Sequence, residues 1–291
     1  MHMSTEQNVR TGFNIGILRA HILPPVLVFL ALLAVWQAAV VLFDIRVYIL
    51  PSPIEVGRTF AENFEQIAQA ASVTAVSFLG GFLLALTVGL SLAVLIIVSP
   101  KLGRGIYPLL IASQTIPTIA IAPLLIIWLG FGLWVKVVIS AVIAFFPIVV
   151  SAVLGFRSVS PTAVDLMRSF PASRTTVFRK LFIPSALPTI FAGMRTASVL
   201  SVIGAVVGEF VAGGDGLASH IIIARSQFET ARVMADLLGL AISGAVFYGL
   251  IALIEFLVLP WKRQSVKRGS GIRKQPTPHA EGAKTRVGAT L

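Results

Sequence analysis

Residues 73–98, VTAVSFLGGFLLALTVGLSLAVLIIV, decide the fold class, because this stretch is apolar throughout and contains no charged side chain. A membrane-spanning helix needs about 20 mostly apolar residues to cross roughly 30 Å of hydrocarbon. The strands of a membrane barrel would instead alternate apolar and polar residues in segments of about ten. A backbone in lipid must also satisfy its own polar groups, which a helix does within one segment. The stretch therefore predicts a transmembrane α-helix.

The composition of the whole chain agrees with a membrane protein. Of its 291 residues, 56% are hydrophobic and only 12% are charged, and the mean hydropathy is +0.92. Soluble domains carry about 25% charged residues, so this chain has too little charge to cover a soluble surface. The net charge of +11 comes from loops and a basic tail rather than from one groove. The composition excludes a disordered chain, a coiled coil and a basic soluble protein that binds nucleic acid.

Further segments share the length and apolar character of residues 73–98, and we expect an all-α membrane protein with six transmembrane helices. The membrane domain covers residues 23–261. It follows a polar N-terminal segment, residues 1–22, and its first apolar run is too long for the core of a cleaved signal peptide. A basic tail, residues 262–291, follows it, and we expect this tail to be disordered and to contact anionic lipid. The expected spans are Leu23–Phe43, Val73–Val98, Tyr107–Leu129, Leu133–Gly155, Leu187–Val211 and Leu237–Leu259.

The basic residues between the spans indicate the orientation. Cytoplasmic segments of membrane proteins carry the excess of Lys and Arg. With the N-terminus inside, seventeen of the 23 Lys and Arg residues fall on the cytoplasmic side and five, including Lys136, on the outer side, while Arg195 lies within a span. We therefore expect both termini in the cytoplasm.

A short helix is expected on the outer side before the second span. Ser52, followed by Pro53 and Glu55, has the pattern of a helix N-cap with proline at the first helical position. The apolar residues after it recur at helical spacing, which is typical of an amphipathic helix that lies on the membrane surface or packs on the spans. These residues are Phe60, Phe64, Ile67 and Ala71.

The cytoplasmic segment 157–185 is much longer than the roughly five residues that a simple connection needs. Pro171 prevents a first helix from continuing, because proline disfavours helical geometry at the residue before it. Ser173 can cap a second helix, Arg174–Phe182, which Pro184 is expected to end. Two short helices that meet at a bend favour a docking surface over a plain loop.

Several polar side chains lie within the expected spans, where they should face a protein interior or an aqueous path. Gln114, Thr115 and Thr118 either line a translocation pathway or form hydrogen bonds between helices. Arg195 either extends its charge to the cytoplasmic interface or faces an anionic solute or an inner gate. Glu209 either belongs to the pathway or caps or pairs with the outside loop.

The residue patterns of common catalytic and cofactor sites are missing from the sequence. It has no cysteine, no Gly-x-x-x-x-Gly-Lys-Ser/Thr loop for ATP phosphates and no His pair at metal-binding spacing. We therefore expect no enzyme activity and no metal or cofactor bound by this chain. These absences favour a transport protein that forms a membrane passage and lacks its own energy source.

The bend in segment 157–185 resembles the EAA loop of ABC-importer permeases. It reads DLMRSFPASR over residues 165–174, with Asp165 at the acidic position and Pro171 at the glycine of the family pattern, and FRKLFIPSALP follows over residues 178–188. Further matches in the family's order resemble the permeases of nitrate, sulfonate and taurine-type importers, with a lean to their pyrimidine, thiamine-precursor and riboflavin branch. These matches are LPSP at 50–53, IP at 116–117, PLLIIWLG at 123–130, AFFP at 144–147, VGE at 207–209 and PW at 260–261.

The resemblance implies the membrane-spanning permease subunit of an ABC importer in the inner (cytoplasmic) membrane. Two copies would form the pathway, two ATPase subunits carrying ATP and Mg²⁺ would dock inside, and a periplasmic or lipid-anchored binding protein would deliver a small organic or anionic solute. The alternative is an ion- or proton-coupled secondary transporter or channel without an ATPase. The residues implied to contact the ATPase are Asp165, Leu166, Met167, Arg168, Ser169, Phe170, Pro171, Ala172 and Ser173.

Overall fold

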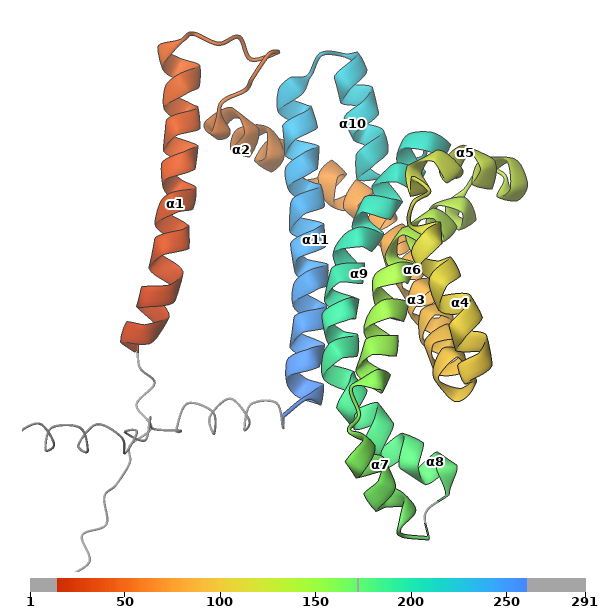
Figure 1. Cartoon of the computed structure of the whole chain (residues 1–291). Helices are drawn as coiled ribbons and strands as arrows, with labels where there is room; N and C mark the ends of the chain where they lie inside the picture. The colour runs from red at the N-terminus through yellow and green to blue at the C-terminus, as the bar shows by residue number, and fades with distance from the viewer. Residues whose placement is uncertain (1–14, 172, 261–291) are drawn as a thin grey trace, which may run out of the picture.

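The computed structural model describes residues 15–171 and 173–260, and every regular element within them is a helix (Figure 1). The expected all-helical fold is confirmed for this part of the chain. The expected tail, residues 262–291, and most of the expected N-terminal segment lie outside the described residues, as does Ala172.

Five helices are long and apolar enough to cross a membrane, and each overlaps one of the expected spans. The fourth of them, α9, is reached without a break from the short helices α8 (Arg174–Val177) and η1 (Phe178–Phe182). The five helices are α1 (Ile15–Leu42), α3 (Phe64–Val98), α6 (Leu133–Arg157), α9 (Ile183–Ala212) and α11 (Thr230–Val258).

The third expected span, Tyr107–Leu129, is not a continuous helix. It is divided between α4 (Pro100–Ser113) and α5 (Thr118–Leu129), which are bent by 100° with respect to each other. Pro117 lies at the break, where proline removes an amide hydrogen and disfavours helical geometry at the preceding residue. The expectation of a continuous helix here is wrong, and the described residues contain five spans, or up to six if the bent pair is one span.

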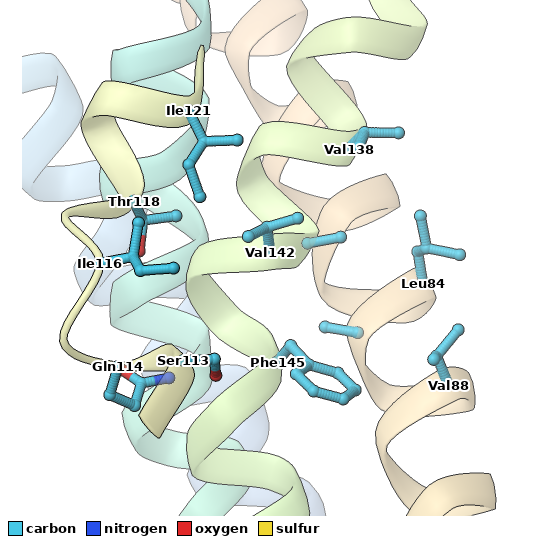
Figure 2. Close-up of a pocket in the computed structure, with 12 residues that line it drawn as sticks. Leu84, Val88, Ser113, Gln114, Ile116, Thr118, Ile121, Val138, Val142 and Phe145 are labelled. Atoms are coloured by element: carbon cyan, nitrogen blue, oxygen red, sulfur yellow. The ribbon is translucent and has the colours of Figure 1, made fainter. Parts of the chain in front are cut away.

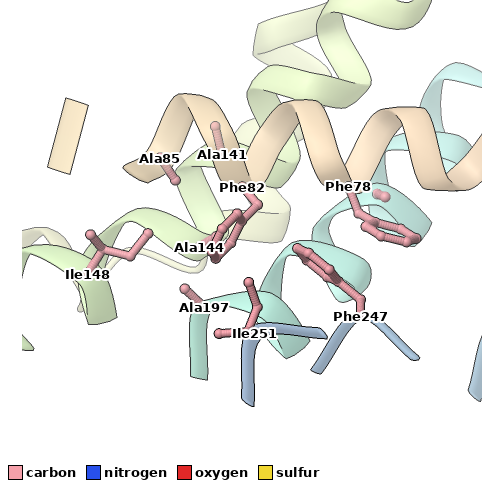
Figure 3. Close-up of a cluster of buried hydrophobic side chains, with 10 residues drawn as sticks. Phe78, Phe82, Ala85, Ala141, Ala144, Ile148, Ala197, Phe247 and Ile251 are labelled. Atoms are coloured by element: carbon pink, nitrogen blue, oxygen red, sulfur yellow. The ribbon is translucent and has the colours of Figure 1, made fainter. Parts of the chain in front are cut away.

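The core of the bundle lies among α3, α6, α9 and α11, with α6 packed along α9 and α3 packed on α6. In one apolar cluster the ring of Phe247 contacts those of Phe78 and Phe82, with 5.1 Å between centroids in both pairs (Figure 3). Small residues such as Ala144 and Ala197, fully buried in the same cluster, let the helix backbones approach closely.

Helix α1 stands apart from the other spans in Figure 1, and its apolar window, Leu23–Leu42, is mostly exposed, with Val40 its one buried residue. It lies mainly against α2 (Pro53–Glu62), where Gln37 Oε1 accepts a long hydrogen bond of 3.5 Å from the Ile54 amide. Its apolar surface is therefore left for lipid or for another protein chain.

The two ends of the bundle carry different short elements. One end carries α2 and α10 (Leu217–Ser226), and the other carries α7 (Pro161–Arg168) and α8. The first residues of α1 and the last of α11 lie at the α7 end in Figure 1. Both termini of the described chain therefore face the same side as segment 157–185.

The predicted cap of α2 is confirmed, because the Ser52 hydroxyl accepts from the Glu55 amide at 3.2 Å. The prediction of a single amphipathic helix in this region is wrong. The chain breaks at Asn63, and Phe64, Ile67 and Ala71 belong to the first turns of α3 rather than to a separate surface helix. Ile67 is only 2% exposed, so this stretch packs into the protein.

Candidate functional site

The first candidate site is the elbow, which we define as α7, α8 and the bend between them, residues 161–177. The Ser169 hydroxyl donates to the Asp165 carbonyl at 3.1 Å at the end of α7. The Ser173 hydroxyl accepts from the Thr176 amide at 3.2 Å and caps α8, as its sequence predicts. The expected bend around Pro171 is therefore present, and side chains hydrogen-bond the backbone at both flanking helix ends.

Two large apolar side chains of the elbow are exposed. Leu166 is 62% and Phe170 is 61% exposed. Leu166 lies in the last turn of α7 and Phe170 two residues beyond its end, so both exposed groups belong to the bend side of the elbow. Exposed apolar groups that lie together are typical of an interaction surface. Of the other residues implied for ATPase contact, Met167 is half-buried; Asp165, Ser169, Pro171 and Ser173 are exposed; the Arg168 side chain and Ala172 lie outside the described residues.

Aromatic contacts join the elbow to the bundle. The ring of Phe178 lies 5.6 Å from that of Phe156 in α6 and 6.0 Å from that of Phe182. Val177, the residue before this stack, is 9% exposed. A displacement of the elbow would therefore be passed to α6 and α9 through packed side chains.

The helix after the elbow does not end at Pro184, contrary to our expectation. Residues 178–182 form a π-helical turn, in which the Ile183 amide bonds to the Phe178 carbonyl, and the chain then continues as α9. A π turn bonds each amide to the fifth residue back and so changes the hydrogen-bond register. This change places Pro184 in the first turn of α9, where a missing amide costs little.

We expect Pro171→Gly to keep or improve the ATPase coupling that the resemblance implies for the elbow. Glycine accepts a proline-like backbone, and positive φ outside glycine occurs among the described residues only at Asp44 and Phe228, so the described part of the bend needs no left-handed residue. The coupling ratio, solute taken up per ATP hydrolysed in a reconstituted importer, should stay within about threefold of the unaltered protein. A complete loss of coupling would contradict this prediction.

The second candidate site is the break between α4 and α5, which opens into a cavity of about 320 Å³ beside the middle of α3 and α6 (Figure 2). Two of the three expected pathway residues of the third span, Gln114 and Thr118, line it. Its other lining residues are Leu84, Ala85, Val88, Ser113, Ile116, Ile121, Val138, Ala141, Val142 and Phe145.

The remaining expected pathway residues do not line this cavity. The Thr115 hydroxyl donates to the Ala112 carbonyl of its own helix at 2.8 Å. Arg195 Nη2 pairs with Glu255 Oε2 of α11 at 2.6 Å, and its guanidinium lies 5.9 Å from the centroid of the Tyr248 ring. The sequence shows both Arg195 and Glu255 but gives no signal that these two residues meet.

Arg195→Ala should lower the free energy of unfolding by about 2–3 kcal/mol, because it removes the guanidinium that pairs with the buried Glu255 carboxylate at 2.6 Å. The loss should be smaller than for a fully buried pair, since the Arg195 side chain is 36% exposed. The double variant Arg195→Met, Glu255→Met should recover most of the lost stability. Thermal unfolding in detergent measures the single and the double variant. Equal stability of Arg195→Ala and the unaltered protein would show that the pair stabilises nothing.

A buried cluster holds the start of α10. It consists of Thr74, Lys136, Glu209 and Gly216. Glu209 is fully buried, and its Oε2 accepts from the Ala218 amide at 2.9 Å. The Thr74 hydroxyl accepts from the Leu217 amide, also at 2.9 Å. Glu209 therefore caps the start of α10, which agrees with a capping role, one of the alternatives left open by its sequence position.

Lys136, in the first turn of α6, belongs to the same cluster and is only 6% exposed. Its ammonium lies against Gly214 and attracts the Glu209 carboxylate. A lysine between two valines at the start of an apolar run carries no local sign of burial. Within residues 15–171 and 173–260, no group of three or more His, Cys, Asp or Glu side chains could hold a metal ion.

Known proteins share this architecture. Residues 81–268 match the family model described as the binding-protein-dependent transport system inner membrane component. The chain is 34% identical over 245 residues to the formylaminopyrimidine transport permease protein ThiX of Halalkalibacterium halodurans, covering 83% of this chain and 97% of that protein. It is 39% identical over 233 residues to the riboflavin transport system permease protein RibX of Chloroflexus aurantiacus, covering 79% and 87%.

The fold itself is similar to a solved structure of the MetNI methionine ABC transporter in inward-facing conformations. The TM-score is 0.58 with 19% identity, and the match covers 67% of this chain and 97% of the solved chain. The family match extends over well more than half of the present sequence. This chain therefore belongs to the binding-protein-dependent transport system inner membrane component family and is a multi-pass permease subunit of an ABC importer.

Proposed function

We propose that the elbow is the docking surface for a separate ATPase subunit, and that ATP-driven movement of that subunit opens and closes the passage. The observation that carries this proposal is the exposure of Leu166 and Phe170 on a capped bend that continues through packed rings into α9. A rigid bend can transmit motion, whereas a loose loop would absorb it. ATP and Mg²⁺ are bound by the ATPase, and this chain binds no cofactor.

The elbow and both termini lie in the cytoplasm in this proposal. The excess of Lys and Arg on the side of segment 157–185 supports this orientation. The opposite end, with α2 and α10, then faces a periplasmic or lipid-anchored binding protein. Phe228, in the turn between α10 and α11, is 78% exposed at this end and provides an apolar contact for that protein.

A second copy of this chain covers the face that carries the α4–α5 break. Residues 111–117 are exposed in the single chain although they lie between membrane-spanning elements. Non-helical backbone at membrane depth is stable only where protein covers it or where it lines an aqueous cavity. Two facing copies would enclose the break and form the passage between them. The solute is a small organic molecule, as the names of ThiX and RibX suggest.

The test is a purification of the tagged chain from its native membrane in mild detergent, with mass spectrometry of the proteins that accompany it. An ATPase subunit with a Walker motif should be recovered. Phe170→Ala should reduce its recovery about tenfold or more, as expected for loss of a buried aromatic anchor. Phe228→Ala is the control, since it removes another exposed ring, at the other end of the bundle, and should leave recovery of the ATPase unchanged.

Two results would contradict the proposal. One is the absence of any ATPase from the unaltered protein, and the other is an ATPase that binds Phe170→Ala normally. In the first case uptake without ATP, driven by an ion or proton gradient, becomes the better explanation.

A further inference from the structure

We propose that the cavity at the α4–α5 break binds an uncharged, hydrogen-bonding heterocycle through Gln114 and Thr118, and that the importer excludes inorganic and sulfonate anions at this point. The inference rests on the proposed function, because it names the solute class of the same passage.

The position of the cavity fits a solute site. Its walls come from the central turns of α3, at Leu84–Val88, and of α6, at Val138–Phe145. Transporters commonly bind their solutes near the middle of the membrane, where interrupted helices expose backbone groups. The volume of about 320 Å³ within one chain is at the lower end of the range for small-molecule sites, roughly 300–1,000 Å³.

The wall of the cavity contains no charged side chain. Gln114, Thr118 and Ser113 provide its polar side chains, and nine apolar residues form the remainder. Within residues 15–171 and 173–260 the side-chain amide of Gln114 and the hydroxyl of Thr118 form no hydrogen bond, so both can bind a solute, each as donor and acceptor. Figure 2 shows them across from Leu84 and Val88, with the half-buried Phe145 ring between, a suitable face for a flat aromatic ring.

The backbone at the break brings together two helix ends of opposite partial charge. The last carbonyls of α4 and the first amides of α5 meet there, separated by residues 114–117. A helix N-terminus alone would favour an anion, but the C-terminus of α4 beside it carries the opposite partial charge. The combination suits a neutral molecule with donors and acceptors on its edge.

Cations within the described spans are engaged elsewhere, among them Arg232, whose guanidinium pairs with Asp236 at 3.4 Å. Arg195 is paired with Glu255, and Lys136 lies against Gly214 beside the Glu209 carboxylate. An anion in the cavity would therefore lose its hydration without gaining a counter-charge, which is strongly unfavourable. An uncharged heterocycle does not lose the hydration of a net charge when it enters the cavity.

The absence of cysteine from the sequence makes a direct test possible. Ser113→Cys and Ile121→Cys place single thiols in the cavity while Gln114 and Thr118 stay intact. Ile127→Cys, on a side chain of α5 that is 75% exposed and outside the cavity, is the control. A water-soluble methanethiosulfonate reagent is added to the purified complex, and mass spectrometry of this chain follows the modification.

The two cavity thiols should react faster than the control, and millimolar riboflavin or formylaminopyrimidine should slow them. Nitrate and butanesulfonate should have no effect. Gln114→Ala in the Ser113→Cys background should weaken the protection about tenfold, the equivalent of one hydrogen bond to the solute. Any of three results would overturn the proposal. The anions could protect the thiols, none of the four probes could protect them, or the cavity thiols could react no faster than the control.

Two substitutions that introduce opposite charges at Gln114 give an independent test. The measurement is ATP-driven uptake by the reconstituted importer. Gln114→Arg and Gln114→Glu should both slow uptake of the native solute, because a neutral solute gains from neither charge. Faster uptake with Gln114→Arg and slower uptake with Gln114→Glu would identify an anionic solute and overturn the proposal. The thiol assay needs no ATP, so it tests the solute site alone. A wrong ATPase assignment would show in the purification experiment, and the two failures are therefore distinguishable.

Discussion

Glu209→Ala is expected to lower the free energy of unfolding by about 3–5 kcal/mol, the largest loss that we expect for a single substitution in this chain. The Glu209 carboxylate is fully buried and accepts from the Ala218 amide at 2.9 Å. Its removal leaves this amide without a partner at the start of α10. It also leaves the Lys136 ammonium, which is 6% exposed, buried without the negative charge beside it. An uncompensated buried charge is more costly than a lost contact.

Thermal unfolding of the purified protein in detergent measures this loss. Glu209→Gln keeps an acceptor for the Ala218 amide but removes the charge, so it should show a smaller loss, about 1–3 kcal/mol. Glu65→Ala removes an exposed carboxylate in the first turn of α3 and should change stability by less than about 1 kcal/mol. If Glu209→Ala unfolded at the temperature of the unaltered protein, the cluster around α10 would not be a source of stability.

Gly204→Val should cost about 3 kcal/mol, the upper end of the range for over-packed interiors. A Cβ at Gly204 would lie 2.5 Å from the Cα of Ser140, which is a backbone atom of α6 and cannot rotate away. α6 and α9 would have to separate where they pack most closely. The separation would also break the hydrogen bond that the Ser140 hydroxyl donates to the Ser201 carbonyl at 2.8 Å.

The matched control is Gly249→Val in α11, where a Cβ meets nothing within 4 Å. This substitution should be neutral or slightly stabilising, because valine is more favourable than glycine in a helix. The difference in unfolding temperature between the two variants isolates the contact between α6 and α9. Equal stability of the two would mean that this contact has room for a side chain, contrary to the distances.

Several features could be predicted because their signals are local. The caps at Ser52 and Ser173 each depend on a hydroxyl and an amide three residues later, and both are present. The continuous spans depend on the summed hydrophobicity of one segment, which is a property of that segment alone. The bend at Pro171 likewise follows from residues within one turn of it.

The break at Pro117 shows the limit of a local signal. Pro123 and Pro147 lie inside α5 and α6, and both helices continue through them. Pro184 was expected to end a helix and instead sits at the start of α9. A proline frees a carbonyl one turn back, and whether the helix survives depends on neighbouring groups that the local pattern does not contain.

The apolar segments and the bend of the elbow can be identified from the order of residues, because they depend on transfer free energies and on the backbone preferences of neighbouring residues. The arrangement of the buried polar groups appears only in the folded chain: Arg195 with Glu255, Lys136 attracted by Glu209, and Gln114 with Thr118 at an open cavity. A medium of low dielectric constant requires a buried charge to have a partner, but it does not specify which one. That choice is made by the packing of whole helices, which brings together residues that are far apart in the chain.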